Sequence, residues 1–356
     1  MCSSASSTGK SEAGVSPEVS STAGAPPQEV DPVSRVRIIV PVRNGGARWR
    51  EAARALQAVV RDPRRVAVID STSSDGSDRV AQECGFEFVQ IDPRTFNHGA
   101  TRQWAVEHFC RDAAFAVFMT HDAVIDGPAS LANLIAAFAD PAVGAAYGRQ
   151  LPHAGAGPFE AHMALFNYAG TSETRSLHDA ARLGIKAAYL SNSFAAYRLT
   201  ALKECGGFPR HLILGEDTWV AVHMLLAGWR IRYCATAQVR HSHSYNVRQE
   251  ARRYFDFGVL HAQLPELMSH FGAAEGEGAR FVASELRYFV STAPWRLPLV
   301  PVRNVARYVG YRLGRMFRRL PPQLCRRLSM TKVYWDNSRA RDSSSRISRE
   351  SGGHEA

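Results

Sequence analysis

The feature that most constrains the fold is an alternation of short β-branched runs and helical segments near the start of the chain. Residues 36–40 (VRIIV) and 66–69 (VAVI) are compact apolar runs that end at Pro41 and Asp70. Between them, apolar residues of 48–60 recur at helical spacing. Because a strand, a helix and a second strand at this spacing form a right-handed βαβ unit, the two strands are expected to lie parallel in one sheet.

The same alternation continues beyond the second strand. The pattern predicts further helices over 77–84 and 99–109, and further strands over 86–91 and 114–120. Strands that alternate with helices are typical of an α/β fold with a mostly parallel central sheet flanked by helices. The N-terminal half is therefore predicted to be a doubly wound, Rossmann-like α/β domain.

The two ends of the chain have a different composition. Residues 1–34 are rich in Ser, Ala, Gly, Pro and Thr, and residues 336–356 are polar and of low complexity. Segments of this kind bury too little apolar surface to offset the loss of chain entropy on folding. Both are predicted to be disordered tails.

Polar side chains follow three of the predicted strands. Arg43 and Asn44 come after the first strand, Asp70 after the second, and His121 and Asp122 after the fourth. Ligands of open α/β sheets bind beyond the carboxyl ends of the strands, so this edge is the predicted site. A single acid after a strand is more often a helix cap, and Asp70 alone would be interpreted that way. The repetition at one edge favours a ligand site.

Two common phosphate-binding motifs are absent from the sequence. No GxGxxG follows the first strand, and no GxxxxGK[ST] occurs anywhere in the chain. A Rossmann dehydrogenase and a P-loop NTPase therefore lose their main support. If the chain binds phosphates, arginine side chains and a divalent cation, Mg²⁺ or Mn²⁺ on hard carboxylate ligands, are the alternatives.

Charge and cysteine content limit the partners and the compartment. Lys and Arg number 43 against 33 Asp and Glu, a formal net charge of +10, which favours anionic partners such as phosphates, nucleic acid or acidic lipid. The six cysteines show no CxxC spacing, so neither a zinc ribbon nor a disulfide framework is predicted. Without a signal peptide or a transmembrane run, the sequence predicts a cytoplasmic protein whose membrane contact is peripheral.

A series of motifs resembles a known enzyme family. They are VRIIVPVRNGG, VIDSTSSDGS, FNHGATRQWA, MTHDAVID, YGRQLP, LSNSFAAYR, GGFP, EDTWVAVHMLLAGWRIRY, HSHSY and RRYFDFGVLH. In this order they resemble the inverting family 2 glycosyltransferases of GT-A type, and most closely the bacterial rhamnosyltransferases that use dTDP-L-rhamnose. The resemblance covers Val36 to His261. It implies a GT-A catalytic domain over 35–262 followed by a basic helical extension over 263–335.

The resemblance also implies a substrate class and a set of binding residues. The donor is expected to be a nucleotide sugar, dTDP-L-rhamnose, and the acceptor a glycan or a lipid-linked glycan. The implied nucleotide-sugar contacts are Pro41, Arg43, Asn44, Asp70, His98, Gly99, Arg102, His121, Asp122, Arg149, Asn192, Glu216 and Trp219.

Some of these positions have a competing structural interpretation. His98 could be a turn residue, Glu216 a helix cap, and Trp219 a core side chain rather than a platform for a sugar ring. For the nearby Asp75, the Ser-Ser-Asp-Gly-Ser sequence favours a turn.

The catalytic base is assigned to Asp217. Transfer with inversion needs one carboxylate that removes the proton of the acceptor hydroxyl as its oxygen attacks the sugar. In the family this base is the Asp of an ED pair at the start of a helix, which matches Glu216-Asp217.

The metal site departs from the family pattern. Many relatives carry Asp-x-Asp where this chain has Thr120-His121-Asp122, so only one acid remains. A lone carboxylate holds a divalent ion weakly, and a second ligand is required. His241 and His243 are the candidates, since alternate residues of a strand point to one side, and the sequence does not choose between them.

The last third of the chain is predicted to be helical over 249–264, 279–291 and 302–320. The third segment carries Arg303, Arg307, Arg312, Arg315, Arg318 and Arg319. A basic amphipathic helix with aromatic residues is typical of an element that binds an anionic membrane surface. A helical cap on the catalytic domain, or a contact in a homo-oligomer, is the alternative.

Three functions follow from the sequence. The first is a metal-dependent inverting rhamnosyltransferase, for which no nucleic-acid partner is expected. The second is another family 2 enzyme that uses a UDP-sugar. The third is a non-catalytic basic protein that binds anionic lipid or nucleic acid.

Overall fold

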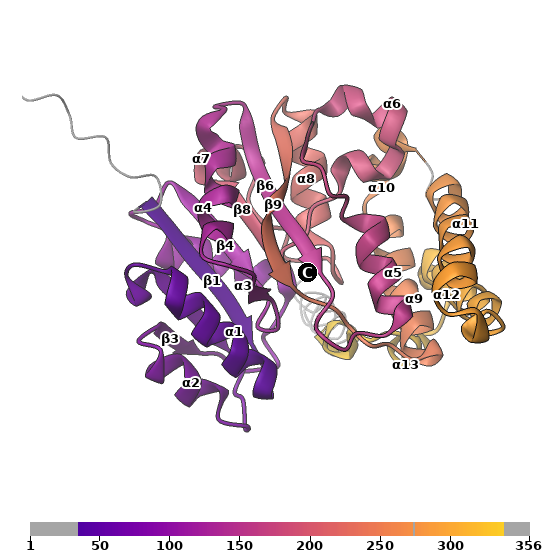
Figure 1. Ribbon diagram of the computed structural model, residues 1–356, viewed down its shortest axis with the longest axis horizontal. Coiled ribbons are helices and arrows are strands. Elements are labelled where there is room, and N and C mark those ends of the chain that lie inside the picture. Colours follow the sequence, from indigo (N-terminus) through magenta and orange to yellow (C-terminus); the bar gives the residue numbers. More distant parts are fainter. Residues whose placement is uncertain (1–34, 273–274, 338–356) are drawn as a thin grey trace, which may run out of the picture. The chain divides into compact units, whose positions relative to one another are not determined.

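The computed structural model describes residues 35–272 and 275–337. These residues contain one sheet with strand order β3-β2-β1-β4-β8-β6-β9-β5, and β7 pairs with β9 (Figure 1). The strands are β1 (Val36–Val42), β2 (Val66–Asp70), β3 (Glu87–Gln90), β4 (Phe115–Met119), β5 (Val124–Ile125), β6 (Val143–Leu151), β7 (Glu173–Arg175), β8 (Phe194–Arg198) and β9 (Arg230–Arg240). The helices are α1 (Gly46–Val59), α2 (Ser77–Glu83), α3 (His98–Phe109), α4 (Ala129–Ile135), α5 (Pro158–Asn167), α6 (Ala180–Leu183), α7 (Leu199–Glu204), α8 (Glu216–Leu226), α9 (Val247–Gln263), α10 (Pro265–Phe271), α11 (Glu275–Thr292), α12 (Leu299–Arg315) and α13 (Pro322–Leu328).

The first half of the sheet is parallel, as the sequence predicted. β1 pairs with β2 and β4, and β2 pairs with β3, all in parallel. β1 continues two residues beyond the predicted run, because Pro41 and Val42 stay in register with Ile69 and Asp70. The other half is mixed, since β8 runs antiparallel to both β4 and β6 while β9 runs parallel to β6. The carboxyl end of β4 therefore lies beside the amino end of β8.

Both faces of the sheet are covered, which explains the continuous apolar runs in β1, β2 and β4. Ile39, Ile69 and Phe118 face one core cluster, and Ile38 and Val68 face the other. α1 and α2 cover the second face beside β1 and β3 (Figure 1). The α/β class and the N-terminal helices predicted from periodicity are confirmed.

The C-terminal helices pack through glycines. α12 approaches α9 so closely that a Cβ at Gly310 would lie 2.1 Å from the Ala251 carbonyl oxygen, and one at Gly314 would lie 2.0 Å from that of Phe255. The predicted helix over 302–320 is corrected here: α12 begins at Leu299 and ends at Arg315, and a 3₁₀ turn follows.

Two of the arginines assigned to a basic surface are internal. Arg303 and Arg307 are buried, and both donate to Glu250, at 2.6 and 2.8 Å. Arg307 also donates to Glu285 at 3.0 Å. These ion pairs join α9, α11 and α12, so neither guanidinium is available to a membrane.

The tails predicted over 1–34 and 336–356 lie outside the described residues, except for 336 and 337, which are helical. Among the described residues, no helix is both long and apolar enough to cross a bilayer.

Candidate active site

Asp122, His241 and His243 come together at the carboxyl edge of the sheet. Asp122 follows β4, and the two histidines follow β9. The short strand β5, which begins two residues after Asp122, pairs with the end of β9 through Val124 and Arg240. His241 Nε2 lies 3.4 Å from Asp122 Oδ1, and His243 Nδ1 lies 3.6 Å from Oδ2. One ligand atom from each residue lies within 4.8 Å of the others, a spacing at which they could hold one metal ion.

Gln150 fixes the orientation of His241. Its Oε1 atom lies 2.8 Å from His241 Nδ1, so this ring nitrogen carries the proton and donates. Nε2, the other ring nitrogen, lies on the side of Asp122 and is buried without a hydrogen-bond partner. A histidine that binds a metal through one ring nitrogen usually donates a hydrogen bond from the other. His241 fits this arrangement, with Nδ1 held by Gln150 and Nε2 facing the Asp122 carboxylate.

His243 completes the group from the solvent side. Burial, and then the charge of His241, lower the pKa of His243 to about 4. Its imidazole is therefore neutral near pH 7, the state in which it can donate a lone pair to a metal. The prediction that both histidines lie on a strand is wrong, because β9 ends at Arg240, but both rings still reach Asp122.

The ED pair lies at the first turn of α8, as predicted. Gly215 precedes it with φ of 76°, and a Cβ there would lie 2.3 Å from the Leu260 side chain, so the entry into α8 needs glycine. Asp217 Oδ2 accepts from the Asn192 backbone N–H at 3.1 Å. Burial, and then the charge of Glu216, raise the pKa of Asp217 to about 6. A carboxylate with a raised pKa is a better proton acceptor near neutral pH.

Glu216 has internal partners. Its Oε1 atom lies 2.9 Å from Arg102 and accepts from Asn192 Nδ2 at 2.8 Å. Burial opposes the charged form, but the Arg102 guanidinium lowers the pKa of Glu216. Arg102 is itself only 3% exposed, so its predicted role as a diphosphate contact stays a prediction that this pairing does not favour.

Gly99 is needed for packing inside the protein. A Cβ at Gly99 would lie 1.8 Å from the Pro209 carbonyl oxygen and 3.3 Å from Glu216 Cβ. This close approach brings α3 against the loop that leads into α8. The predicted close approach of Gly99 to a ligand phosphate therefore has a competing explanation in the fold.

A chain of polar contacts connects the Asp122/His241/His243 group to the ED pair. Gln150, which orients His241, donates from Nε2 to Ser191 Oγ at 2.8 Å. The next residue, Asn192, donates its backbone N–H to Asp217 and its side-chain amide to Glu216. Asp122 and Asp217 are thus linked through adjacent residues at one edge of the sheet, despite their separation in sequence.

The turns after β1 and β2 form a second polar cluster. Asp70 is fully buried and accepts from the Ser73 N–H at 2.8 Å, and Asn44 accepts from the Ser74 N–H at 2.8 Å. Asn44 adopts φ of 47°, a left-handed turn conformation. Asp75 accepts from Ser77 and from the Gly46 N–H, which confirms its role in the turn. The nucleotide contacts assigned to Asp70 and Asn44 stay predictions.

The remaining predicted contacts have mixed surroundings. Pro41 is part-buried in β1, Arg43 is exposed beyond it, and burial lowers the pKa of His121. Arg149 lies in β6 with a buried Nε atom that has no partner. Trp219 stacks on His223 one turn along α8, with ring centroids 3.7 Å apart, which favours the interpretation of Trp219 as a packing residue.

His98 opens α3 beside the ED pair. Burial lowers its pKa to about 4, while Glu216 opposes that shift. The ring also packs edge-on against Phe96, with centroids 5.1 Å apart. His98 is thus a neutral imidazole near the proposed base, and its role in donor binding stays a prediction.

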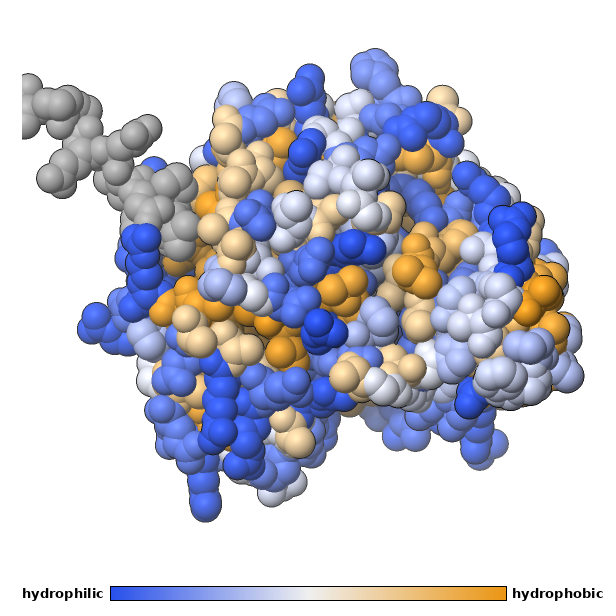
Figure 2. All heavy atoms as spheres, in the orientation of Figure 1, coloured by the Kyte–Doolittle hydropathy of each residue, from blue (hydrophilic) through white to orange (hydrophobic). Residues whose placement is uncertain are grey.

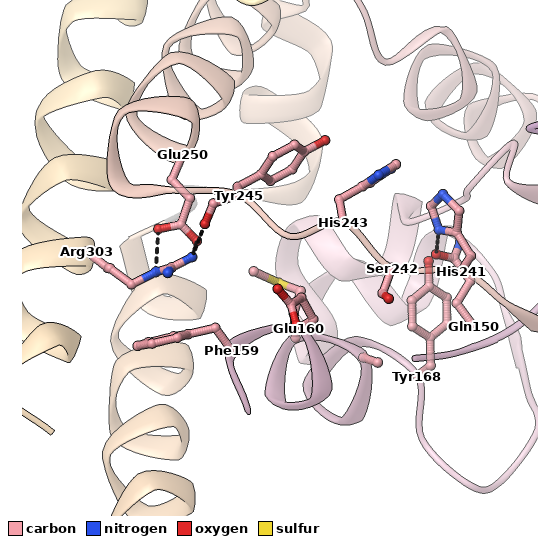
Figure 3. A pocket seen from close by; sticks show the side chains of 12 residues that line it. Gln150, Phe159, Glu160, Tyr168, His241, Ser242, His243, Tyr245, Glu250 and Arg303 are labelled. Carbon is pink, nitrogen blue, oxygen red and sulfur yellow. Dashed lines mark hydrogen bonds and ion pairs between the residues drawn. The ribbon is translucent and has the colours of Figure 1, made fainter. Parts of the chain in front are cut away.

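A pocket of about 140 Å³ opens beside His241 and His243 (Figure 3). Glu160, Tyr168 and Tyr245 line it, and sequence reasoning missed all three. The Oε2 atom of Glu160 is buried without a partner. α5, which carries Glu160, has no motif of its own, and only its packing against this edge brings the carboxylate here.

Comparisons with known proteins show which family the chain resembles. Residues 31–255 match the family model described as "Glycosyltransferase like family 2". The chain is 43% identical over 301 residues to the O-antigen chain rhamnosyltransferase WbaN of Salmonella anatum, covering 84% of this chain and 95% of the relative. It is 41% identical over 304 residues to the O-antigen chain rhamnosyltransferase RfbN of Salmonella typhimurium, covering 85% and 96%.

A solved structure has the same fold. The mannosyltransferase PcManGT from Pyrobaculum calidifontis, in complex with GDP-Man and Mn²⁺, superposes with a TM-score of 0.51 at 18% identity, covering 85% of this chain and 84% of that one. This likeness confirms the predicted GT-A fold. The match over most of the chain, together with the fold and the order of its motifs, establishes that the chain belongs to glycosyltransferase family 2 and is a glycosyltransferase.

Proposed function

We propose that this glycosyltransferase transfers L-rhamnose from dTDP-L-rhamnose to a glycan of the O-antigen type, with inversion at the anomeric carbon. The observation that carries the proposal is the link between the Asp122/His241/His243 group and Asp217 through Gln150, Ser191 and Asn192. The names of the two relatives, both O-antigen chain rhamnosyltransferases, support the sugar and the acceptor class.

Asp217 is the proposed base. Its carboxylate takes the proton of the acceptor hydroxyl while that oxygen forms a bond to the anomeric carbon, and the bond from this carbon to the diphosphate oxygen breaks. Asn192 orients Asp217 through its backbone N–H, and the negative charge of Glu216 raises the proton affinity of Asp217. The nucleoside diphosphate leaves with both bonding electrons.

Asp122, His241 and His243 are the proposed ligands of a divalent cation. The fit is supported by the buried Nε2 atom of His241, which lies near Asp122 without a hydrogen bond, and by the neutral state of His243. Two nitrogen ligands favour Mn²⁺ over Mg²⁺, because Mg²⁺ selects oxygen ligands. Such a cation supplies charge neutralisation for the departing diphosphate. The positions of Asp122, His241 and His243 determine where the diphosphate would bind.

A panel of donors tests the proposal. The purified protein is mixed with dTDP-, UDP- and GDP-sugars, with Mn²⁺ or with EDTA, and nucleotide release is measured. The proposal predicts release from dTDP-rhamnose alone and its loss in EDTA. Release from a UDP-sugar instead would favour the alternative family 2 donor, and release that persists in EDTA would contradict the metal site. The third alternative, a non-catalytic binding protein, is excluded by the family.

A further inference from the structure

The last described residues of the chain pack into the protein, although much of the C-terminal extension faces outward. Hydrophobic side chains are exposed at the edge where α11 and α12 lie (Figure 2). Trp335, in contrast, is only 6% exposed, and its ring packs near those of Phe255 in α9 and Phe317, with centroids 6.4 and 6.0 Å away. Residues 329–337, which follow α13, therefore pack on the main core. We call them the C-terminal strap.

The C-terminal strap is anchored on the middle of α9 through a buried carboxylate. Asp256 is fully buried, and its Oδ2 atom accepts from the backbone N–H groups of Met330 and Thr331, at 3.0 and 3.3 Å. The Thr331 hydroxyl donates to the same oxygen at 3.3 Å. Because buried polar groups are costly to leave unpaired, these contacts fix the direction in which the strap leaves α13.

Tyr334 of the strap is joined through one side chain to the loop that precedes the ED pair. Gln263, the last residue of α9, donates from Nε2 to the Tyr334 hydroxyl at 2.7 Å. Its Oε1 atom accepts from the Ile213 backbone N–H at 3.3 Å. Ile213 is fully buried and lies shortly before Asp217 in the chain. The amide of Gln263 thus connects the strap to the segment that leads into α8.

The same loop is tied to the start of α3. The Leu212 carbonyl oxygen accepts from Asn97 Nδ2 at 3.0 Å, and Asn97 Oδ1 caps α3 by accepting from the Ala100 N–H at 2.9 Å. At the far end of the strap, Asn337 Nδ2 donates to the Arg94 carbonyl oxygen at 2.9 Å. The strap therefore contacts the segment before α3 directly, and the segment before α8 through the last residue of α9.

The position of Asp217 depends on the loop before α8. Residues 207–215 contain no helix or strand, so contacts with their surroundings hold them in place. α9 contacts this loop twice: Gln263 bonds to Ile213, and Leu260 lies against Gly215. A displacement of about 1 Å in an active site can lower a rate about 100-fold, so the support of this loop matters for the reaction.

We infer that the C-terminal strap positions the proposed base, because Tyr334, acting through Gln263, holds the loop before α8 and with it Asp217. The inference rests on the proposed function, since it takes Asp217 as the base. Tyr334 and Gln263 are positioning residues, which act through the backbone of the loop and not through contact with a substrate. The C-terminal extension then contributes to turnover from behind the active site.

Tyr334→Phe tests the inference, because it removes one hydroxyl and keeps the ring beside Trp335. The measured rate is dTDP release from saturating dTDP-rhamnose with Mn²⁺, with water as the acceptor. We expect this rate to fall about tenfold, between the effect of one lost hydrogen bond and that of a displaced base. The affinity for dTDP should stay within about twofold, since the donor contacts are kept. A full rate would overturn the inference, and so would a loss confined to dTDP affinity.

Asp336→Asn is a matched control on the same strap. It breaks the ion pair of Asp336 with Arg326 of α13, at 2.6 Å, which leads to no part of the active site. An exposed pair of this kind contributes little to stability, so the rate should stay within about twofold. Thermal melts establish that both variants are folded at the assay temperature. Equal losses in Asp336→Asn and Tyr334→Phe would indicate a general loosening of the strap and would overturn the inference.

A double-mutant cycle tests whether Tyr334 acts through Gln263. Gln263→Met removes both amide contacts, so adding Tyr334→Phe should lower the rate no further. Gln263→Glu should keep most of the rate, because one carboxylate oxygen still accepts from the Ile213 N–H and the other accepts from the Tyr334 hydroxyl. Additive losses in the cycle would overturn the route through Gln263.

Amide hydrogen exchange gives a readout that needs no substrate. In Tyr334→Phe the exchange of residues 208–217 should accelerate about threefold or more, while that of α12 stays unchanged. Unchanged exchange over 208–217 would overturn the inference. The unaltered protein and Asp217→Asn are assayed for dTDP release alongside. If the first is inactive or the second keeps the full rate, the proposed function fails, and the exchange data still decide whether the strap holds the loop.

Discussion

Replacing Gln150 by Leu should weaken metal binding without removing a metal ligand. The Gln150 amide oxygen accepts the Nδ1 proton of His241 at 2.8 Å, and both side chains are more than nine-tenths buried. Without this acceptor the Nδ1 proton is left unpaired in the interior, at a cost of about 1–3 kcal/mol. His241 can also change tautomer and turn Nε2 away from Asp122. We expect a loss of about 10- to 100-fold in Mn²⁺ affinity, the usual effect of removing such a partner.

The assay is a titration with Mn²⁺, followed by calorimetry or by the loss of the free-ion electron paramagnetic resonance signal. Ser191→Ala is the matched control, because it removes the contact with Gln150 Nε2 but leaves the amide oxygen on His241. It should lower the affinity by about threefold, which corresponds to the lower part of the net value of about 0.5–1.5 kcal/mol for one hydrogen bond. If folded Gln150→Leu protein binds Mn²⁺ as tightly as the unaltered chain, the assignment of His241 as a ligand is refuted.

Other predictions concern the ED pair and its support. Asp217→Asn should lower the transfer rate by about 10²- to 10⁴-fold and leave donor affinity unchanged, as measured by steady-state kinetics and donor titration. A transfer rate equal to that of the unaltered enzyme would show that Asp217 is not the base. The unprotonated form of Asp217 acts as the base, and its pKa is raised to about 6. The transfer rate should therefore be constant above about pH 6 and fall about tenfold per pH unit below it. A rate that stays constant down to about pH 5 would contradict the role of Asp217. Gly215→Ala should lower the free energy of unfolding, measured by urea denaturation, by about 2–4 kcal/mol. The causes are the left-handed backbone at this position and the collision of the new Cβ with Leu260. Stability equal to that of the unaltered chain would show that α8 does not need glycine here. Arg102→Met should lower the free energy of unfolding by about 3–5 kcal/mol, because it leaves Glu216 buried without its partner. The double variant that also carries Glu216→Gln should recover much of this loss. A stable single variant with weakened donor binding would instead favour a contact of Arg102 with the diphosphate.

The parallel half of the sheet could be predicted because its signals are local. The β-branched runs before Pro41 and Asp70 are separated by a helical period, and chirality then leaves one arrangement of the two strands. The antiparallel insertion of β8 between β4 and β6 has no such signal, since it depends on pairing between segments about 75 residues apart, such as Met119 with Phe194.

Individual side chains were predicted less well than the edge they occupy. The sequence placed Asp122 and the two histidines together, as the structure has them, but it did not predict the ion pair between Arg102 and Glu216 in the interior. The sign of a charge is visible in a sequence, whereas its partner depends on packing, here on the close contact of Gly99 with the loop before α8. Glu160 was missed for the same reason, because only the fold brings α5 to the histidines.

The central claim is that the metal ligands and the base act on one donor molecule. Diffraction from crystals containing Mn²⁺ and dTDP, with data collected at the manganese absorption edge, tests it most directly. The account predicts an anomalous peak between Asp122, His241 and His243, with the diphosphate bound to that ion on the side that faces Asp217. A manganese ion elsewhere, or a diphosphate on a surface unconnected to Asp217, would contradict it.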